Sequence, residues 1–246
     1  WLATEFRKQG MSLKKLHRLI VTSSTYRQDS KASPSLLQKD PQNRLLARGP
    51  RFRLSGELIR DHMLKASGKL SGKMFGPGVY PPQPLTVLAH AFGNKSWNAS
   101  KGEDRYRRSV YTFIKRTAPF AGFMTFDGTS GENCLAKRDR SNTPLQALTL
   151  LNDEMYLELA RAAGQEVHQK KDDPVESLFR RFLTRPPKQS ETDALRAYYE
   201  QQIKRLEKGE IKPTDIADDP KASPELAGKV LLARAIMNLD EAITKP

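Results

Sequence analysis

Four of the pairs in which a short polar residue precedes proline constrain the fold of this chain most strongly. They are Asp40-Pro41, Thr143-Pro144, Asp173-Pro174 and Ser223-Pro224. The polar side chain of such a pair can accept a backbone N–H of the first helical turn. Proline fits the first helical position because its missing N–H would have no partner there. Each pair therefore predicts the start of a helix.

Apolar spacing predicts the same helices and several more. At Thr143 the prediction is a capping box, with Gln146 reaching back to the helix start. Gly68 is expected to end the helix predicted at 54–64. One predicted helix follows Ser12 and fades near 22–25, and another spans 54–64. In the second half of the chain, one helix begins at Thr143, the next runs from Asn152-Asp153 to about Val167, and a third begins at Asp173. The last two run from Ser190 to Gly209 and follow Ser223. Residues 210–222 are predicted to form a polar linker.

The middle of the chain has a different character. Residues 68–104 are rich in Gly and Pro, which predicts a long loop, and loops of that length are usually functional or disordered. Residues 108–115 are rich in β-branched and aromatic side chains and are the best strand candidate. We expect this strand to pair with one other short strand.

These patterns predict a mainly α protein, a helical bundle with a small β element and a long Gly/Pro-rich loop region. Hydrophobic residues make up 37% of the 246 residues and the mean hydropathy is −0.65, values that fit a folded domain with long polar connections. We predict a single helical domain over 1–246, with N-terminal helices in 1–67, the loop and strand region in 68–142 and C-terminal helices in 143–246. The C-terminal helices are expected to pack on the N-terminal ones, and 68–142 to lie over one end of the bundle.

The positive charge is unevenly distributed. Residues 1–150 hold 26 Lys and Arg against 10 Asp and Glu, a net charge of +16, whereas residues 151–246 hold 16 against 18. A localised excess attracts polyanions: nucleic acid, an acidic polysaccharide or an acidic partner domain. The alternative is a solvated basic surface without a particular ligand.

The strongest basic cluster flanks the strand candidate. Guanidinium groups hold phosphate, sulfate or carboxylate in bidentate fashion, and aromatic rings among them can stack on a sugar or base. The predicted ligand-binding residues are Arg105, Arg107, Arg108, Lys115, Arg116, Arg138 and Arg140. The alternative is internal ion pairing, with Asp127, Glu132 and Asp139 as the neutralising partners.

The same three acids permit an enzyme hypothesis, because glycoside hydrolysis commonly uses two carboxylates. Asp127, Glu132 and Asp139 are thus weak catalytic candidates. Cys134, the only cysteine, is either a thiol with a lowered pKa beside basic residues or, as we expect, a buried inert one.

No strong catalytic signature accompanies these residues. The chain has no phosphate-binding Gly-rich loop with Lys, no His-Glu-x-x-His and no Cys-x-x-Cys-His. The four histidines, His17, His62, His90 and His168, are scattered singly and are expected to be structural or exposed. We therefore predict no cofactor and no metal, and leave open whether the chain is an enzyme.

The sequence bears on cellular context in two ways. No apolar run reaches the roughly 18–20 residues that a membrane-spanning helix needs. Trp1 to Phe6 reads as the middle of a helix, so we expect a piece of a longer protein, in which case a missing signal peptide is uninformative.

Several segments together resemble one family. They are Lys15 to Ser23 with Tyr26-Arg27, Asn43 to Leu46, Arg107 to Phe113, Phe126-Asp127, Arg140 to Leu148, Leu151 to Asp153, and Asn238 to Glu241. In this order they resemble a planctomycete-specific domain of unknown function found at the C-terminal end of large secreted proteins, often downstream of a cytochrome-c-like domain. The resemblance covers nearly the whole chain.

The resemblance implies an extracytoplasmic setting and a mainly helical fold, and it brings no established activity. Combined with the charge, it favours a non-catalytic binding or interaction module whose basic face receives an acidic polymer, such as a polysaccharide, or an adjacent domain of the same protein. The alternative is part of a carbohydrate-active or redox-linked extracytoplasmic enzyme. Nucleic acid is the least favoured partner, since only the charge supports it.

Overall fold

The computed structural model describes residues 1–88, 96–132 and 134–245. In these residues the predicted mainly α fold is confirmed, since helices dominate and the sheet has two short strands. The chain divides into two compact units, each described here by itself. The N-terminal unit comprises Trp1–Arg53 with the residues from Thr244 onward, and the main unit comprises Leu54–Ile243. The single domain expected over the whole chain stays a prediction.

The N-terminal unit consists of short elements without a core. None of the hydrophobic side chains of residues 1–53 is buried. Ser12 and Ser33 each accept a backbone N–H at a helix start. The elements are α1 (Leu2–Lys8), α2 (Leu13–Val21), α3 (Pro34–Lys39), and the antiparallel strands β1 (Phe52–Arg53) and β2 (Thr244–Lys245), with Phe52 opposite Lys245.

The helix start predicted at Asp40-Pro41 is wrong. Helix α3 begins earlier, after Ser33, and ends at Lys39. The Asp40 carboxylate accepts the N–H groups of Arg44 and Leu45, both at 2.8 Å, and so closes a turn. Asn43 and Leu46 then take left-handed φ values of 54° and 53°, which a helix does not accommodate.

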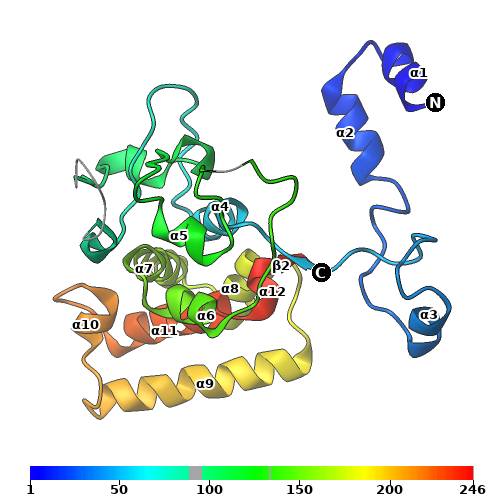
Figure 1. The fold of residues 1–246 in the computed structure, drawn as a ribbon. Helices are drawn as coiled ribbons and strands as arrows, with labels where there is room; N and C mark the ends of the chain where they lie inside the picture. Colours follow the sequence, from blue (N-terminus) through cyan, green and yellow to red (C-terminus); the bar gives the residue numbers. More distant parts are fainter. Residues whose placement is uncertain (89–95, 133, 246) are drawn as a thin grey trace. The chain divides into compact units, whose positions relative to one another are not determined.

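Two long helices form the centre of the main unit. Helices α7 (Glu154–Lys170) and α11 (Pro224–Met237) lie side by side and pack most extensively against each other, with α9 (Gln189–Glu207) along the outer side of α11 (Figure 1). Around them lie α4 (Gly56–Ala66), α6 (Pro144–Asn152), α8 (Pro174–Leu183), α10 (Pro213–Ala217) and α12 (Asp240–Ile243). The predicted packing of the C-terminal helices on the earlier ones holds for α4, which contacts α7 and α8.

Most of the predicted helix starts in this unit are confirmed. The side chains of Asp153, Asp173 and Ser223 accept backbone N–H groups at the starts of α7, α8 and α11. The Gln146 side-chain oxygen accepts the backbone N–H of Thr143 at 3.4 Å, as the capping box requires. Two predictions were imprecise: α9 is capped by Lys188 rather than Ser190, and the expected linker 210–222 contains α10.

The strand predicted at 108–115 is wrong. Its first part forms a 3₁₀ turn, η3 (Ser109–Tyr111), and Thr112 makes only an isolated bridge to Val79. The reason is that the Ser109 N–H donates to the Asp61 carboxylate of α4 at 2.6 Å instead of to a neighbouring strand. The rest of 68–142 is mostly irregular, as expected, with η1 (Leu85–Leu88), η2 (Gly102–Tyr106) and α5 (Ala121–Thr125), while residues 89–95 and 133 lie outside the described residues.

None of the described helices combines the length and apolar character that crossing a membrane requires.

A glycine sets the close approach of the two central helices, and this leads to a first prediction. A Cβ added at Gly164 of α7 would lie 2.9 Å from the backbone nitrogen of Val230 in α11. We expect Gly164→Ala to lower the free energy of unfolding by about 1–3 kcal/mol, although alanine favours a helix. Urea denaturation measures this loss. Gly72→Ala is the matched control, since nothing lies within 4 Å of its Cβ, and equal stability of the two variants would contradict the packing.

An ion pair between α7 and α8 leads to a second prediction. Glu166 accepts two hydrogen bonds from Arg181, both at 2.6 Å, and one from Lys170 at 2.8 Å. The hydrogen bonds from Arg181 lower the pKa of Glu166 from 4.5 to about 2. A pKa depressed in the folded state stabilises the protein above pH 4.5, and this contribution disappears as the pH falls towards 2.

We therefore expect Glu166→Gln to destabilise the protein at neutral pH and the difference from wild type to shrink between pH 4.5 and 2. Thermal unfolding at a series of pH values measures it. Glu200→Gln, at an exposed position of α9, should show no such convergence. A destabilisation by Glu166→Gln that does not change with pH would disprove the ion-pair explanation.

Candidate functional site

Arg107, one of the predicted ligand contacts, is completely buried. Its guanidinium donates to the carbonyl oxygens of Phe75 and of Pro77, the latter at 3.1 Å, and lies 3.8 Å from the ring centre of Tyr111. These contacts hold the loop 75–77 against η3. A ligand in solution does not reach this side chain, so the ligand-binding role predicted for Arg107 does not fit its position.

A second buried arginine, which the sequence did not single out, lies beneath the same segment. Arg60 of α4 donates to the carbonyl oxygens of Arg107 at 2.7 Å and Arg105 at 3.1 Å, and to the Ser109 hydroxyl at 3.3 Å. Burial lowers the pKa of Arg60 to about 10, against the opposing effect of the neighbouring Asp61. Arg60 therefore stays charged at neutral pH and ties residues 105–109 to α4.

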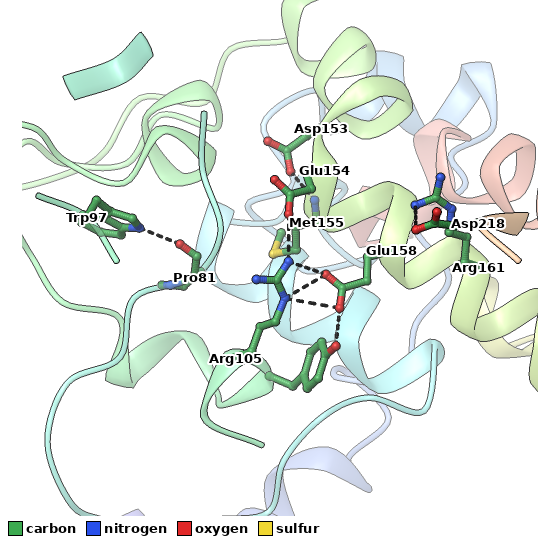
Figure 2. Close-up of polar contacts among 10 residues, drawn as sticks. Pro81, Trp97, Arg105, Asp153, Glu154, Met155, Glu158, Arg161 and Asp218 are labelled. Carbon is green, nitrogen blue, oxygen red and sulfur yellow. Dashed lines mark hydrogen bonds and ion pairs between the residues drawn. The ribbon is translucent and has the colours of Figure 1, made fainter. Parts of the chain in front are cut away.

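Arg105 is held by two carboxylates of α7. Its guanidinium contacts Glu158 at 2.8 Å and Glu154 at 2.9 Å (Figure 2). The Tyr106 hydroxyl also donates to Glu158, and burial together with this carboxylate raises the pKa of Tyr106 to about 12. Internal pairing, the alternative considered from the sequence, thus applies to Arg105, but its partners come from α7 and not from Asp127, Glu132 or Asp139.

The remaining predicted basic residues are more accessible. Arg108, with a side chain 52% exposed, lies 3.7 Å from Asp61, and Arg138, 41% exposed, donates to both oxygens of Glu57 at 2.8 Å. Lys115 donates to the carbonyl oxygen of Ser96 at 3.3 Å. Arg116 and Arg140 are exposed. The predicted ligand-binding residues therefore fall into two groups. Arg105 and Arg107 are held by other residues of the protein, whereas solvent reaches the remaining five.

The three predicted acids occupy different environments in the described part of the chain. Asp127, at a left-handed φ of 59°, accepts the backbone N–H of Ser141 at 2.7 Å and the Ser141 hydroxyl at 2.8 Å, which closes the loop 127–141. Glu132 and Asp139 are exposed. None of the three lines the cavity described next, so their proposed catalytic pairing stays a prediction without geometric support.

A cavity of about 400 Å³ lies over α4 in the main unit, which is within the range of small-ligand sites. Two carboxylates from consecutive turns of α4 face it, each beside an arginine from a distant segment. Much of its apolar surface is open to solvent, with Val110 75% and Ile114 69% exposed. Its lining is Glu57, Leu58, Asp61, Arg108, Ser109, Val110, Thr112, Phe113, Ile114, Pro119, Phe120, Phe123, Met124, Thr129 and Arg138.

A row of packed aromatic rings supports one wall of this α4 cavity. Phe113 packs on Tyr80 at 5.0 Å between ring centres, Tyr80 meets Trp97 edge-to-face at 5.2 Å, and Trp97 stacks on Phe120. Phe123 in turn meets Phe120 edge-to-face at 5.0 Å. The Trp97 indole N–H donates to the Pro81 carbonyl at 2.7 Å and so fixes the row (Figure 2). Such packing holds the rings in place without a bound ligand.

The carboxylates of the α4 cavity are arranged as acceptors. Burial raises the pKa of Glu57, but the hydrogen bonds from its own backbone N–H and from Arg138 outweigh this effect and hold the pKa below its usual range. Asp61 accepts the Ser109 N–H and faces Arg108. The cavity therefore offers carboxylate acceptors and guanidinium donors side by side over an apolar surface.

Glu57 and Asp61 were not among the site residues predicted from the sequence. Their spacing of four residues places both on one face of α4, but that spacing is common on helices. Only the folding of 108–114 and 129–138 over α4 makes these two positions special, and no local pattern predicts that folding.

Other predicted residues were placed as follows. Cys134 is exposed, so the expectation of a buried thiol is wrong, because the described residues around it, 131–132 and 135–140, lie on the surface. The His62 ring bonds to the Phe182 carbonyl at 2.8 Å, His17 is exposed, and His90 lies outside the described residues. Within the described part of the chain, no three or more His, Cys, Asp or Glu residues are grouped as a metal ion requires.

The helical part of the main unit contains a polar cluster that was also not predicted from the sequence. Lys229, whose side chain is only 5% exposed, lies 2.7 Å from Glu225 and 3.4 Å from the His168 ring at the wall of a second cavity. Glu225 satisfies its charge, which is sufficient reason for a buried lysine at this place.

Comparison with known proteins identifies a family without a known activity. The family model described as PSD1, protein of unknown function (DUF1553), matches residues 1–199. No curated protein and no solved structure matches this chain.

The two classes of arginine lead to a third prediction. Arg107→Ala would remove the side-chain donors to the carbonyl oxygens of Phe75 and Pro77 and leave an empty space beside Tyr111, so we expect it to lower the free energy of unfolding by about 1–3 kcal/mol. Arg116→Ala, at an exposed position, should change it by less than about 0.5 kcal/mol. Denaturant unfolding of both variants measures the contrast. Similar small effects would show that Arg107 is not a strut.

Proposed function

Since the chain belongs to the DUF1553 family of proteins of unknown function, we propose that it is a non-catalytic binding module that holds an acidic polysaccharide at the α4 cavity. The observation that carries this proposal is the combination of an open apolar bed with paired acceptors and donors in one cavity. The extracytoplasmic setting implied by the family resemblance belongs to the same proposal.

The chemistry of a sugar ring matches this combination. One face of a pyranose ring carries C–H groups that pack on the faces of aromatic rings, and the cavity offers Phe113 and Phe123. Neighbouring ring hydroxyls each donate and accept one hydrogen bond, which suits a carboxylate beside a guanidinium. Glu57 with Arg138 and Asp61 with Arg108 present two such pairs.

The preference for an acidic polymer comes from the charge around the cavity. Residues 105–140 hold eight Lys and Arg against three Asp and Glu. Arg105 and Arg107 are consumed internally, which leaves Arg108 and Arg116 as accessible cations next to the apolar bed: a Cβ added at Gly131 would contact both Ile114, which lines the cavity, and Arg116. A carboxylate or sulfate on a bound sugar would meet these guanidinium groups.

A hydrolytic role for this cavity is less well supported. Hydrolysis of a glycosidic bond needs a carboxylic acid that donates a proton, and such acids have raised pKa values. The pKa of Glu57 is held below its usual range by its own backbone N–H and Arg138, against the effect of burial. Glu57 therefore fits an acceptor of hydrogen bonds better than a proton donor.

Titration with heparin, a sulfated polysaccharide, tests the proposal and gives a fourth prediction. We expect binding of the whole chain to weaken steeply between 50 and 300 mM salt, roughly as expected when several charges are screened. Arg108→Ala with Arg116→Ala should weaken binding at low salt by about five- to tenfold. Val110→Asp places a negative charge in the cavity, which repels the negatively charged heparin, and should weaken binding further.

Two controls identify the binding surface. Lys204→Ala with Lys208→Ala, exposed positions at the end of α9, removes the same charge elsewhere in the main unit. Lys14→Gln with Lys15→Gln does so in the N-terminal unit. If either control weakens heparin binding as much as the arginine variant, the α4 cavity is not the site.

A further inference from the structure

We infer that the N-terminal unit is a docking surface for an acidic protein surface. This inference concerns a different part of the chain from the α4 cavity and does not depend on the proposed function. It rests on three observations: the absence of a core in the unit, its charge, and the exposed apolar face of α2.

The N-terminal unit does not bury apolar surface of its own. All residues from 1 to 53 are described, and their only buried members are Asp40 and Gly49. Helices α1 and α2 have seven and nine residues, and isolated helices shorter than about 12–15 residues are marginal in water. Short helices without a core become stable when another surface covers their apolar side, so this unit needs a partner.

The apolar side is extensive. In α2 the hydrophobic residues Leu13, Leu16 and Ile20 lie at helical spacing, and Leu13 and Ile20 are 62% and 41% exposed. Further exposed hydrophobic side chains are distributed over α1, α2, α3 and the turns that follow them. They include Trp1, Leu2, Met11, Val21, Tyr26, Leu37, Leu45 and Leu46.

The net charge of the N-terminal unit indicates which chemical groups its partner carries. Residues 1–53 carry twelve Lys and Arg against three Asp and Glu, a net charge of +9, whereas residues 54–243 carry 29 against 25. In α2 the exposed Lys14, Lys15 and Arg18 occupy the side of the helix away from Leu16 and Ile20. The partner surface therefore combines acidic groups with an apolar area.

These features favour an acidic protein over the other partners. A polysaccharide would neutralise the lysines but leave the leucines and isoleucine uncovered. A second copy of this chain brings more positive charge in both units. A bilayer would accept one amphipathic helix in its plane, but here the exposed apolar residues are spread over α1, α2 and the turn at 45–46. Interfaces that complete a folding unit are of the permanent, apolar type.

Site-specific photo-crosslinking in the cells that encode this chain tests the inference. The full product of the gene would carry a photoreactive amino acid at Leu13 or Ile20, and mass spectrometry would identify the crosslinked peptides. We expect one recurrent protein site, rich in Asp and Glu, for both positions. The same amino acid at Glu200 of α9 is the control for labelling by chance.

Charge reversal provides the second arm. Lys14→Glu, Lys15→Glu and Arg18→Glu together should lower the yield at Ile20 roughly tenfold. Lys204→Glu, Lys208→Glu and Lys212→Glu, a matched reversal in and after α9, should leave it unchanged. Circular dichroism of each variant checks that the helices of the main unit remain.

Each other outcome overturns the inference. Crosslinks to lipid alone would indicate a membrane surface, crosslinks to a second copy would indicate self-association, and crosslinks to residues 54–243 of the same chain would indicate an internal interface. A recurrent site without acidic residues, or a yield that charge reversal does not change, would remove the electrostatic argument. Because Arg108 and Arg116 take no part, their substitution leaves this experiment unchanged and separates it from the test with heparin.

Discussion

The buried guanidinium groups of Arg60 and Arg107 are the interactions on which the irregular half of the main unit depends. Residues 75–77 lie outside helices and strands, and residues 105–109 lie in and between the short 3₁₀ turns η2 and η3, so side-chain donors help to hold their carbonyl oxygens. Arg60 provides them for residues 105 and 107, and Arg107 provides them for residues 75 and 77. A planar group with five N–H donors and no acceptor is well suited to this task.

This network also explains why neighbouring arginines have opposite roles. Residues 105–108 lie between α4 and solvent, so Arg107 points into the protein while Arg108 lies at the rim of the α4 cavity. Asp61 joins the two sides: it accepts the Ser109 N–H, which fixes the turn after Arg107, and it faces the Arg108 side chain. The cavity is thus formed by the same contacts that hold the irregular chain in place.

The helices were predictable from the sequence, and the candidate site was not, for one physical reason. A cap such as Asp173 or Ser223 acts on N–H groups two or three residues away, so the pattern contains its own partner. The wrong prediction at Asp40 has a local cause, but the failures around the candidate site involve distant partners. Residues 108–115 have the composition of a strand, yet Asp61, 48 residues before Ser109, takes the backbone N–H that a strand would need. In the sequence Arg107 resembles the arginines beside it. Its structural role comes only from the hydrogen bonds that it donates to the loop 75–77.

The same distinction applies to the charge. Residues 1–150 hold the positive excess of the sequence, and the arginines around 105–140 are its most visible cluster. The structural boundary at residue 53 moves most of that excess into the N-terminal unit, while the main unit is nearly neutral for its size. Charge in the main unit is largely balanced by pairing: Arg105 with Glu158, Arg138 with Glu57, Arg181 with Glu166. Charge in the N-terminal unit has few acids to pair with, and its apolar residues have no core to enter. We infer that a surface with this excess of charge and exposed apolar area is completed by binding, whereas the main unit buries an apolar core of its own.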